Sequence, residues 1–137
     1  MLVFYDRQCG YCRWSVAQLL RADRDQRLRL IAIQSDEGQR LLAAIPAAQR
    51  LDSAHLIDGD GRLLSGGAAA APLAGALPPL AAAAPLLRAL ERPVNALYRL
   101  IASQRQQVGR FVSSGARAKA DQAIAAHEAR FASAGGQ

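Results

Sequence analysis

The sequence contains few of the residues that mark specialised protein classes. Only 2 of its 137 residues are cysteine, aromatic residues make up 5%, and a single lysine stands among the 17 basic residues. Two cysteines are too few for a secreted disulfide scaffold. Charged residues make up 20% and apolar residues 51%, which is typical of a globular chain and not of a disordered one. We therefore expect one domain, large enough to bury its own core.

The start of the chain lacks the marks of a secretory signal peptide. Met1 is followed directly by the strand-like run LVFYD, with neither a basic segment nor a long apolar one. We therefore expect a cytoplasmic protein. In a reducing cytosol, a close pair of cysteines is more often catalytic or metal-binding than structural.

The long uncharged segment at residues 63–87 is a poor candidate for a membrane span, although it is long enough to cross a bilayer. Four prolines and three glycines interrupt it. Proline inside a helix costs about 3 kcal/mol unless its neighbours compensate. The segment therefore predicts short, broken helices in a globular domain, and no membrane span.

Positive charge is concentrated in the second half of the chain. The net charge is +6, of which residues 1–67 contribute +1 (9 Arg, 8 acids) and residues 68–137 contribute +5 (7 Arg, 1 Lys, 3 acids). A basic half of this kind could bind nucleic acid or an anionic membrane surface. An arginine-rich surface that is simply solvated would give the same net charge. No nucleic-acid recognition motif accompanies the charge, so we expect no nucleic-acid partner.

The first part of the chain alternates between strand and helix patterns. The apolar run at 2–5 predicts a buried strand, a helical pattern follows from Cys9, and 28–33 is again strand-like. A strand, a helix and a strand in this order form a βαβ unit with parallel strands and a right-handed crossover. Ser35 predicts the N-cap of a second helix, which should end before Pro46.

A hairpin and a helical second half complete the pattern. Residues 54–64 have apolar flanks around a glycine-rich turn at 58–61, which predicts two antiparallel strands. Prolines then divide the chain into short helices, Pro93 suits the first turn of a longer one, and Ser114-Gly115 marks a break before a last helix. The apolar stripe of the longer helix comprises Val94, Leu97, Tyr98 and Ile101.

This order of elements is β-α-β-α-β-β-α followed by further helices. It is the order of a thioredoxin-like core, in which helices cover both faces of a four-stranded mixed sheet. The fold class predicted from the pattern is therefore α/β and thioredoxin-like, with a helical C-terminal extension.

The two cysteines are predicted to lie where the first strand meets the first helix. Cys9 falls at the helix N-terminus, where unpaired backbone N–H groups and the positive end of the helix dipole favour thiolate over thiol. Cys12 lies one turn further along, on the apolar face. Because thiolate is the attacking species in disulfide exchange, we predict Cys9 as the nucleophile and Cys12 as the buried resolving thiol.

Asp6, three residues before Cys9, permits two interpretations. Its carboxylate either accepts backbone N–H bonds of the loop or transfers the proton of a thiol. At about 8 Å and an effective dielectric of about 20, a carboxylate opposes the thiolate by roughly 2 kcal/mol. Arg7 and Arg13 act in the opposite direction. The sequence leaves both interpretations open.

Two structural roles compete with redox chemistry at the cysteines. A disulfide across so short a loop would stabilise the fold by only about 2 kcal/mol, and a reducing cytosol would not maintain it. Zinc requires about four ligands, and the chain adds only His55 and His127, which lack metal-site spacing. His127 lies on an apolar helical stripe and is predicted to be a packing residue. We therefore expect no metal and no cofactor.

The segment FYDRQCGYCRWSVAQLL resembles the opening of the DCC-type thiol–disulfide oxidoreductases, which are named for the pattern D-x-x-C-x-x-C. Asp6, Cys9 and Cys12 reproduce that pattern, and the segments LDSAHLIDGDGRLLSGGAA and ALYRLIASQRQQVGRF are also similar to the family. The resemblance covers residues 1–112 and implies a thioredoxin-like domain with dithiol redox activity. It gives Cys9 and Cys12 the redox roles and Asp6 an accompanying acidic role. Residues 113–137 lie outside it as a helical tail.

One departure from the thioredoxins concerns substrate binding. Thioredoxins have a cis-proline before the third strand, opposite the cysteines, which helps to hold a substrate backbone, whereas Ser53 and Ala54 occupy that region here. The resulting hypothesis is a thiol–disulfide oxidoreductase. Its partners would be a disulfide-containing protein or small thiol substrate and a cellular dithiol reductant. The alternative is a non-catalytic thioredoxin-like module that binds a partner through its basic helical half.

Overall fold

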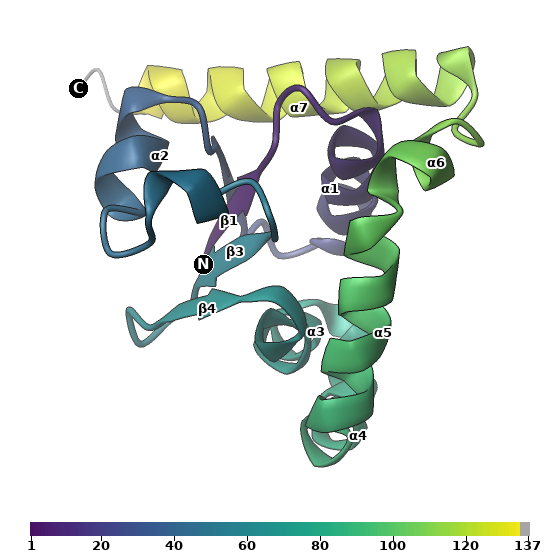
Figure 1. Ribbon diagram of the computed structural model, residues 1–137. Helices are drawn as coiled ribbons and strands as arrows, with labels where there is room; N and C mark the ends of the chain where they lie inside the picture. Colours follow the sequence, from purple (N-terminus) through teal and green to yellow (C-terminus); the bar gives the residue numbers. More distant parts are fainter. Residues whose placement is uncertain (135–137) are drawn as a thin grey trace.

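Four strands form one mixed sheet in the order β2-β1-β3-β4 in the computed structural model, which describes residues 1–134 (Figure 1). β1 (Leu2–Tyr5) pairs in parallel with β2 (Arg29–Ala32) and antiparallel with β3 (His55–Ile57). β3 in turn pairs antiparallel with β4 (Leu63–Ser65). The predicted parallel pair and the predicted hairpin are both confirmed.

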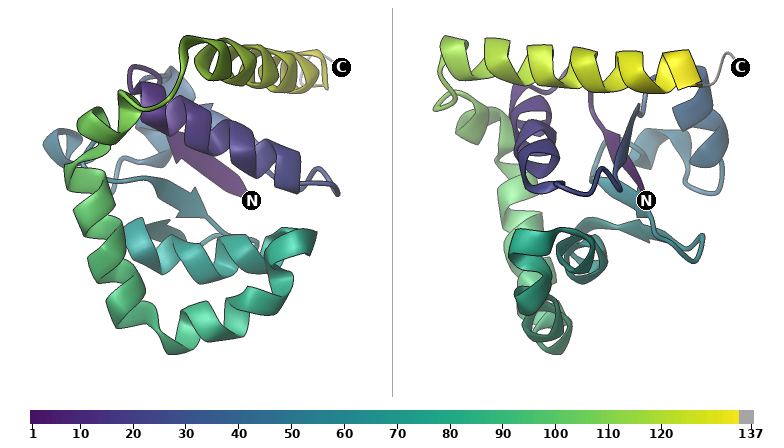
Figure 2. Two further views of the ribbon diagram at one scale, coloured as in Figure 1. Left: turned by 90° about the vertical axis from the view of Figure 1, so that its right-hand side faces the viewer. Right: turned by 180° about the vertical axis from the view of Figure 1, so that it is seen from behind.

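Helices flank the sheet and extend beyond it (Figures 1 and 2). The α-helices are α1 (Gly10–Ala22), α2 (Asp36–Leu41), α3 (Ala70–Ala76), α4 (Ala84–Ala89), α5 (Glu91–Ser103), α6 (Arg105–Gly109) and α7 (Ser114–Ala134). The 3₁₀ turns are η1 (Ala47–Gln49), η2 (Gly66–Ala69) and η3 (Pro78–Ala83). This α/β architecture, a four-stranded mixed sheet with flanking helices, is thioredoxin-like, as the order of sequence patterns predicts.

Caps and prolines set the helix boundaries where the sequence places them. The Ser35 Oγ accepts the N–H of Gly38 at 3.0 Å and caps α2, which ends before Pro46. Pro78 and Pro85 lie in the first turns of η3 and α4, where a backbone N–H is not needed. The long uncharged segment therefore forms short pieces. Within residues 1–134, no helix is both long and apolar enough to cross a membrane.

Alternation along the strands divides the core into one cluster on each face of the sheet. Val3 and Tyr5 point toward α1 and α7, whereas Phe4 points toward α2. The larger cluster comprises Val3, Tyr5, Val16, Leu28, Leu30, Ala32, Leu56, Ala69, Leu77 and Ile124. The smaller cluster comprises Phe4, Ile31, Ile33 and Leu42. Helices therefore cover both faces of the sheet, as predicted.

The long helix α7 packs across α1 and reaches the edge strand β2 (Figures 1 and 2). It begins at Ser114, so the predicted last helix is confirmed. The Nε2 of His127 accepts the N–H of Leu30 in β2 at 3.2 Å, and the ring is buried. His127 is therefore a packing residue, as predicted. The other buried residues of α7 are Ala120 and Ile124.

Helix α5 packs on η2 through a glycine. The Gly67 N–H donates to the Oδ1 of Asn95 at 3.3 Å, and a Cβ on Gly67 would lie 2.5 Å from the Asn95 Cα. Only part of the predicted apolar stripe of α5 is packed, because most contacts of this helix are made with η2. Tyr98 is half-buried, but Leu97 is 58% exposed.

Candidate active site

Cys9 caps the N-terminus of α1, so the sequence prediction of its position is confirmed. Its backbone is extended, and its Sγ accepts the N–H of Cys12 at 3.2 Å. The Cys12 thiol also donates to the Cys9 Sγ, with the two sulfurs 2.6 Å apart. Both cysteines are free thiols and half-buried. The two sulfurs are therefore close enough to join in a disulfide with little movement of the chain.

The Cys12 thiol is held in its protonated form. Burial raises the pKa of Cys12 most strongly, and the hydrogen bond and the charge of Cys9 raise it further. Arg105 lowers this pKa, and Asp6 contributes a smaller rise. The protonated thiol is the form that can donate to Cys9.

The Asp6 carboxylate orders the loop between β1 and α1. Its Oδ1 accepts the N–H of Gln8 at 2.9 Å and the side-chain amide of Gln34 at 2.7 Å. Its backbone carbonyl accepts the N–H of Cys9 at 3.3 Å. Asp6 thus shapes the approach to Cys9 through both its side chain and its backbone.

The two cysteines face different cavities. Cys9 lines a pocket of about 390 Å³ with Gly10 and Tyr11, against α6 and the start of α7. Cys12 lines a more enclosed and mainly apolar cavity of about 230 Å³ between α1, β3 and α5. One sulfur therefore faces a polar, open pocket, and the other faces the interior.

Three arginines of the Cys9 pocket could not be identified as site residues from local sequence patterns. Arg105 and Arg110 come from α6 and the turn after it, and Arg117 comes from α7. They lie about a hundred residues beyond the cysteines and share no motif with them. The only signal was the excess of positive charge in the second half of the chain. Tertiary packing brings that charge to Cys9.

Both backbone groups of Ala54, the residue just before β3, are hydrogen-bonded within the chain. The Ala54 N–H donates to the Oη of Tyr98 at 2.6 Å, and the Ala54 carbonyl accepts the N–H of Gly66 at 2.9 Å. Burial raises the pKa of Tyr98, so its hydroxyl remains protonated at neutral pH. No peptide bond within residues 1–134 is cis, in line with the Ser53-Ala54 sequence at this place.

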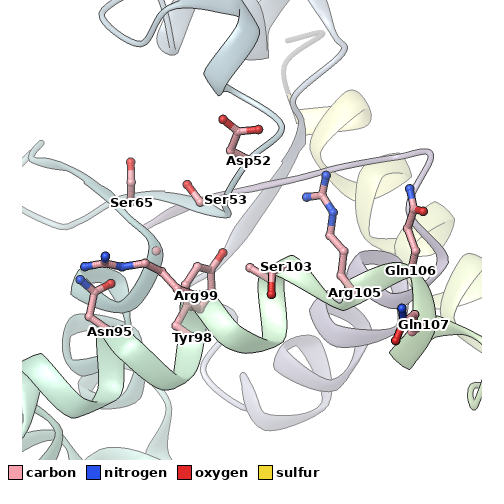
Figure 3. A pocket seen from close by; sticks show the side chains of 12 residues that line it. Asp52, Ser53, Ser65, Asn95, Tyr98, Arg99, Ser103, Arg105, Gln106 and Gln107 are labelled. Atoms are coloured by element: carbon pink, nitrogen blue, oxygen red, sulfur yellow. The ribbon is translucent and has the colours of Figure 1, made fainter.

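A second polar pocket, of about 810 Å³, adjoins the Cys9 pocket through Arg105 and Gln106, which line both (Figure 3). It lies between the loop carrying Asp52 and Ser53 and one side of α5. Neither cysteine lines it. The chemistry of the two thiols therefore belongs to the smaller pocket, and the larger one extends the polar surface beside it.

Both histidine side chains bond to groups other than the cysteines, although His55 lines the same cavity as Cys12. The His55 Nε2 donates to the carbonyl of Arg50 at 2.9 Å, and its Nδ1 is 2.7 Å from the hydroxyl of Ser65. His127 lies on α7, against β2. In the part of the chain that the structure describes, no three His, Cys, Asp or Glu side chains form a cluster suited to a metal ion.

The chain combines a thioredoxin-like sheet with a CxxC pair at the start of the first helix. This combination is typical of proteins that react through cysteine thiols. The family model of the DCC1-like thiol-disulfide oxidoreductases matches residues 3–111, and the chain belongs to this family. At the level of the family it is therefore a thiol–disulfide oxidoreductase, as the resemblance in the sequence implied. No curated protein and no solved structure matches the chain.

Proposed function

We propose that the chain exchanges a Cys9–Cys12 dithiol for a disulfide in the cytoplasm, with Cys9 as the nucleophile and Cys12 as the resolving thiol. The proposal is carried by the sulfur geometry, because the Cys9 and Cys12 Sγ atoms lie 2.6 Å apart, within easy reach of a disulfide. The two environments support the division of roles. Cys9 faces the open pocket, and burial keeps Cys12 protonated.

The proposed reaction has two exchange steps. The Cys9 thiolate attacks one sulfur of a substrate disulfide, forms a mixed disulfide and releases the first substrate thiolate. Cys12 then gives its proton to a released thiolate, and its sulfur attacks the Cys9 Sγ. The Cys9–Cys12 disulfide forms and the second substrate thiolate leaves. The protein loses two electrons, the substrate gains two, and a cellular dithiol reductant regenerates the protein.

Asp6 is the accompanying acidic residue in this proposal. Its Oδ1 holds the loop before Cys9 through Gln8 and Gln34. Its negative charge also raises the pKa of Cys12, although less than burial does. Asp6 thus helps to keep the resolving thiol protonated until the mixed disulfide has formed.

The roles can be tested with reduced protein and the neutral 2-hydroxyethyl disulfide. The wild-type chain should release two thiols and finish with the Cys9–Cys12 disulfide. Cys12→Ser should release one thiol and stop at a mixed disulfide on Cys9, whereas Cys9→Ser should release none at a comparable rate. Mass spectrometry identifies each product, and thiol release is followed by absorbance. A stable mixed disulfide on Cys12 in place of Cys9 would reverse the assignment.

A second candidate function is a non-catalytic interaction module that uses the basic helical half. It is favoured by apolar side chains exposed on α4 and α5 and at the turn between them. Leu86 is 61% exposed, Leu90 45%, Leu97 58% and Leu100 57%. The same assay separates the two functions, because an interaction module would release thiol no faster than an ordinary free cysteine does.

A further inference from the structure

We propose that the Cys9 pocket selects a small disulfide that carries carboxylates. This inference rests on the proposed exchange function and names its substrate class. The pocket brings three guanidinium groups, those of Arg105, Arg110 and Arg117, to the walls around Cys9, against the single carboxylate of Asp6. The three arginines and Asp6 therefore sum to +2 at neutral pH, and to +1 when Cys9 is the attacking thiolate.

None of these three arginines forms a salt bridge within residues 1–134. The salt bridges of the described chain use Arg7, Arg13, Arg27, Arg29 and Arg62. Arg105 donates to the carbonyl of Leu51, and Arg117 donates to the carbonyl of Gly109 at 2.6 Å, so both are held in place without losing charge. Charge-assisted hydrogen bonds from such groups to a substrate carboxylate are about twice as strong as neutral ones.

Arg117 lies directly beside the helix end that carries Cys9. A Cβ added to Gly10 would be 3.7 Å from the Arg117 Nε. This Nε is buried and donates to no acceptor of residues 1–134. The positive end of the 13-residue helix α1 adds to the same field. Arginine and helix end thus act together on an anion bound next to the Cys9 sulfur.

Two observations favour a small molecule over a polypeptide. An extended polypeptide binds beside a strand by pairing with free backbone groups, but the N–H and the carbonyl of Ala54 are already bonded to Tyr98 and Gly66. The Cys9 pocket, at about 390 Å³, lies at the lower end of the range for small-molecule sites. One half of a small disulfide is of a suitable size to fill it.

The test uses three short disulfides that differ mainly in charge: anionic 3,3′-dithiodipropionate, neutral 2-hydroxyethyl disulfide and cationic cystamine. Each is mixed with reduced wild-type protein at low ionic strength, and loss of the Cys9 thiol is followed by mass spectrometry. Each rate constant is divided by that of dithiothreitol with the same disulfide, because this division removes differences in leaving-group reactivity. We expect a normalised preference of about tenfold for the anionic over the cationic disulfide, which weakens in 0.5 M salt.

Arg110→Gln is the most direct variant, because the Arg110 side chain is exposed and makes no hydrogen bond within residues 1–134. It should lower the ratio of anionic to cationic rates about fourfold. Arg88→Gln is the matched control. Arg88 is exposed on α4, lines none of the pockets described above, and its loss changes the net charge equally. The control should leave the ratio unchanged.

The outcomes distinguish this inference from the function on which it rests. Equal normalised rates for the three disulfides would contradict the proposed selectivity for anionic disulfides, as would equal effects of Arg110→Gln and Arg88→Gln. Either result would leave the proposed exchange by Cys9 intact. Reaction of none of the three at Cys9 would overturn the exchange function itself. A disulfide-linked acidic peptide that reacts faster than dithiodipropionate would replace the small molecule with a polypeptide substrate.

Discussion

At the scale of the residue, a sulfur takes the place of the oxygen that usually caps a helix. Serine, threonine, aspartate and asparagine are the common N-caps, because their oxygen accepts a backbone N–H of the first turn. The Cys9 Sγ does this for the N–H of Cys12. A disulfide with Cys12 would reorient that sulfur and weaken it as an acceptor. The redox state and the start of α1 are therefore coupled through one atom.

Trp14 should report this coupling, because it is the only tryptophan and lies in the first turns of α1. Its ring stacks on that of Tyr11, with 6.1 Å between centroids. We expect its fluorescence to change when the Cys9–Cys12 disulfide forms, to recover with a dithiol, and to stay constant in Cys12→Ala.

Titration of the Trp14 fluorescence in a thiol–disulfide buffer gives the reduction potential of the pair. A value between about −270 and −120 mV is expected for an exchange catalyst. A value below about −300 mV would instead indicate a structural bond.

At the scale of the element, α5 lies so close to η2 that only glycine fits at position 67. Substituting Gly67→Ala would place a Cβ 2.5 Å from the Asn95 Cα, which is backbone and cannot rotate away. We expect this variant to lower the free energy of unfolding by about 1–3 kcal/mol in urea denaturation. Gly59→Ala is the matched control, because a Cβ there meets no atom within 4 Å. Similar losses in both variants would contradict the close approach of α5.

The helix α7 adds a pH-sensitive contact at the edge of the sheet. Burial is the main cause that lowers the pKa of His127, and the charge of Arg130 lowers it further, while Asp23 and Glu128 oppose the shift. Below about pH 6.5, the His127 imidazole therefore binds a proton more readily in the unfolded chain than in the folded one. Stability falls as the pH falls through this range. Burial lowers the pKa of His55 as well, with the same sign.

His127→Gln should reduce this pH dependence. The glutamine side chain retains an oxygen that can accept the N–H of Leu30, but it does not titrate. Urea denaturation of both proteins between pH 7.5 and pH 5 measures the two slopes. We expect a shallower slope for the variant. Identical slopes would show that His127 does not contribute to the loss of stability in acid.

At the scale of the whole molecule, local sequence patterns predicted the helices and strands but not the tertiary contacts between them. The strand at 2–5 and the hairpin at 54–64 follow from short runs of residues, and Cys9 begins the helix where its pattern starts. The contact of Tyr98 with Ala54 spans 44 residues of sequence, and that of Arg117 with the helix end at Gly10 spans about a hundred. No local pattern encodes such contacts, so half of the pocket could not be predicted.

The division between residues 1–112 and 113–137 remains a prediction, and truncation after Val112 tests it. We expect the truncated chain to lose cooperative unfolding or to melt well below the full chain, because α7 buries Ala120, Ile124 and His127 against the rest of the fold. Circular dichroism during heating measures the change. A truncated chain with unchanged melting would show that residues 113–137 are a separable tail.

The position of α7 in the chain also affects the order of events during synthesis. Translation delivers the N-terminal part first, so every strand and both cysteines leave the ribosome before α7 does. Until then, the outer N–H of Leu30 in β2 has no His127 to bond, and the helix end at Gly10 has no Arg117 beside it. The nascent chain thus passes through a stage in which the β2 edge of the sheet is open and less positive charge lies near Cys9. An open strand edge at that stage is a template for pairing with another chain.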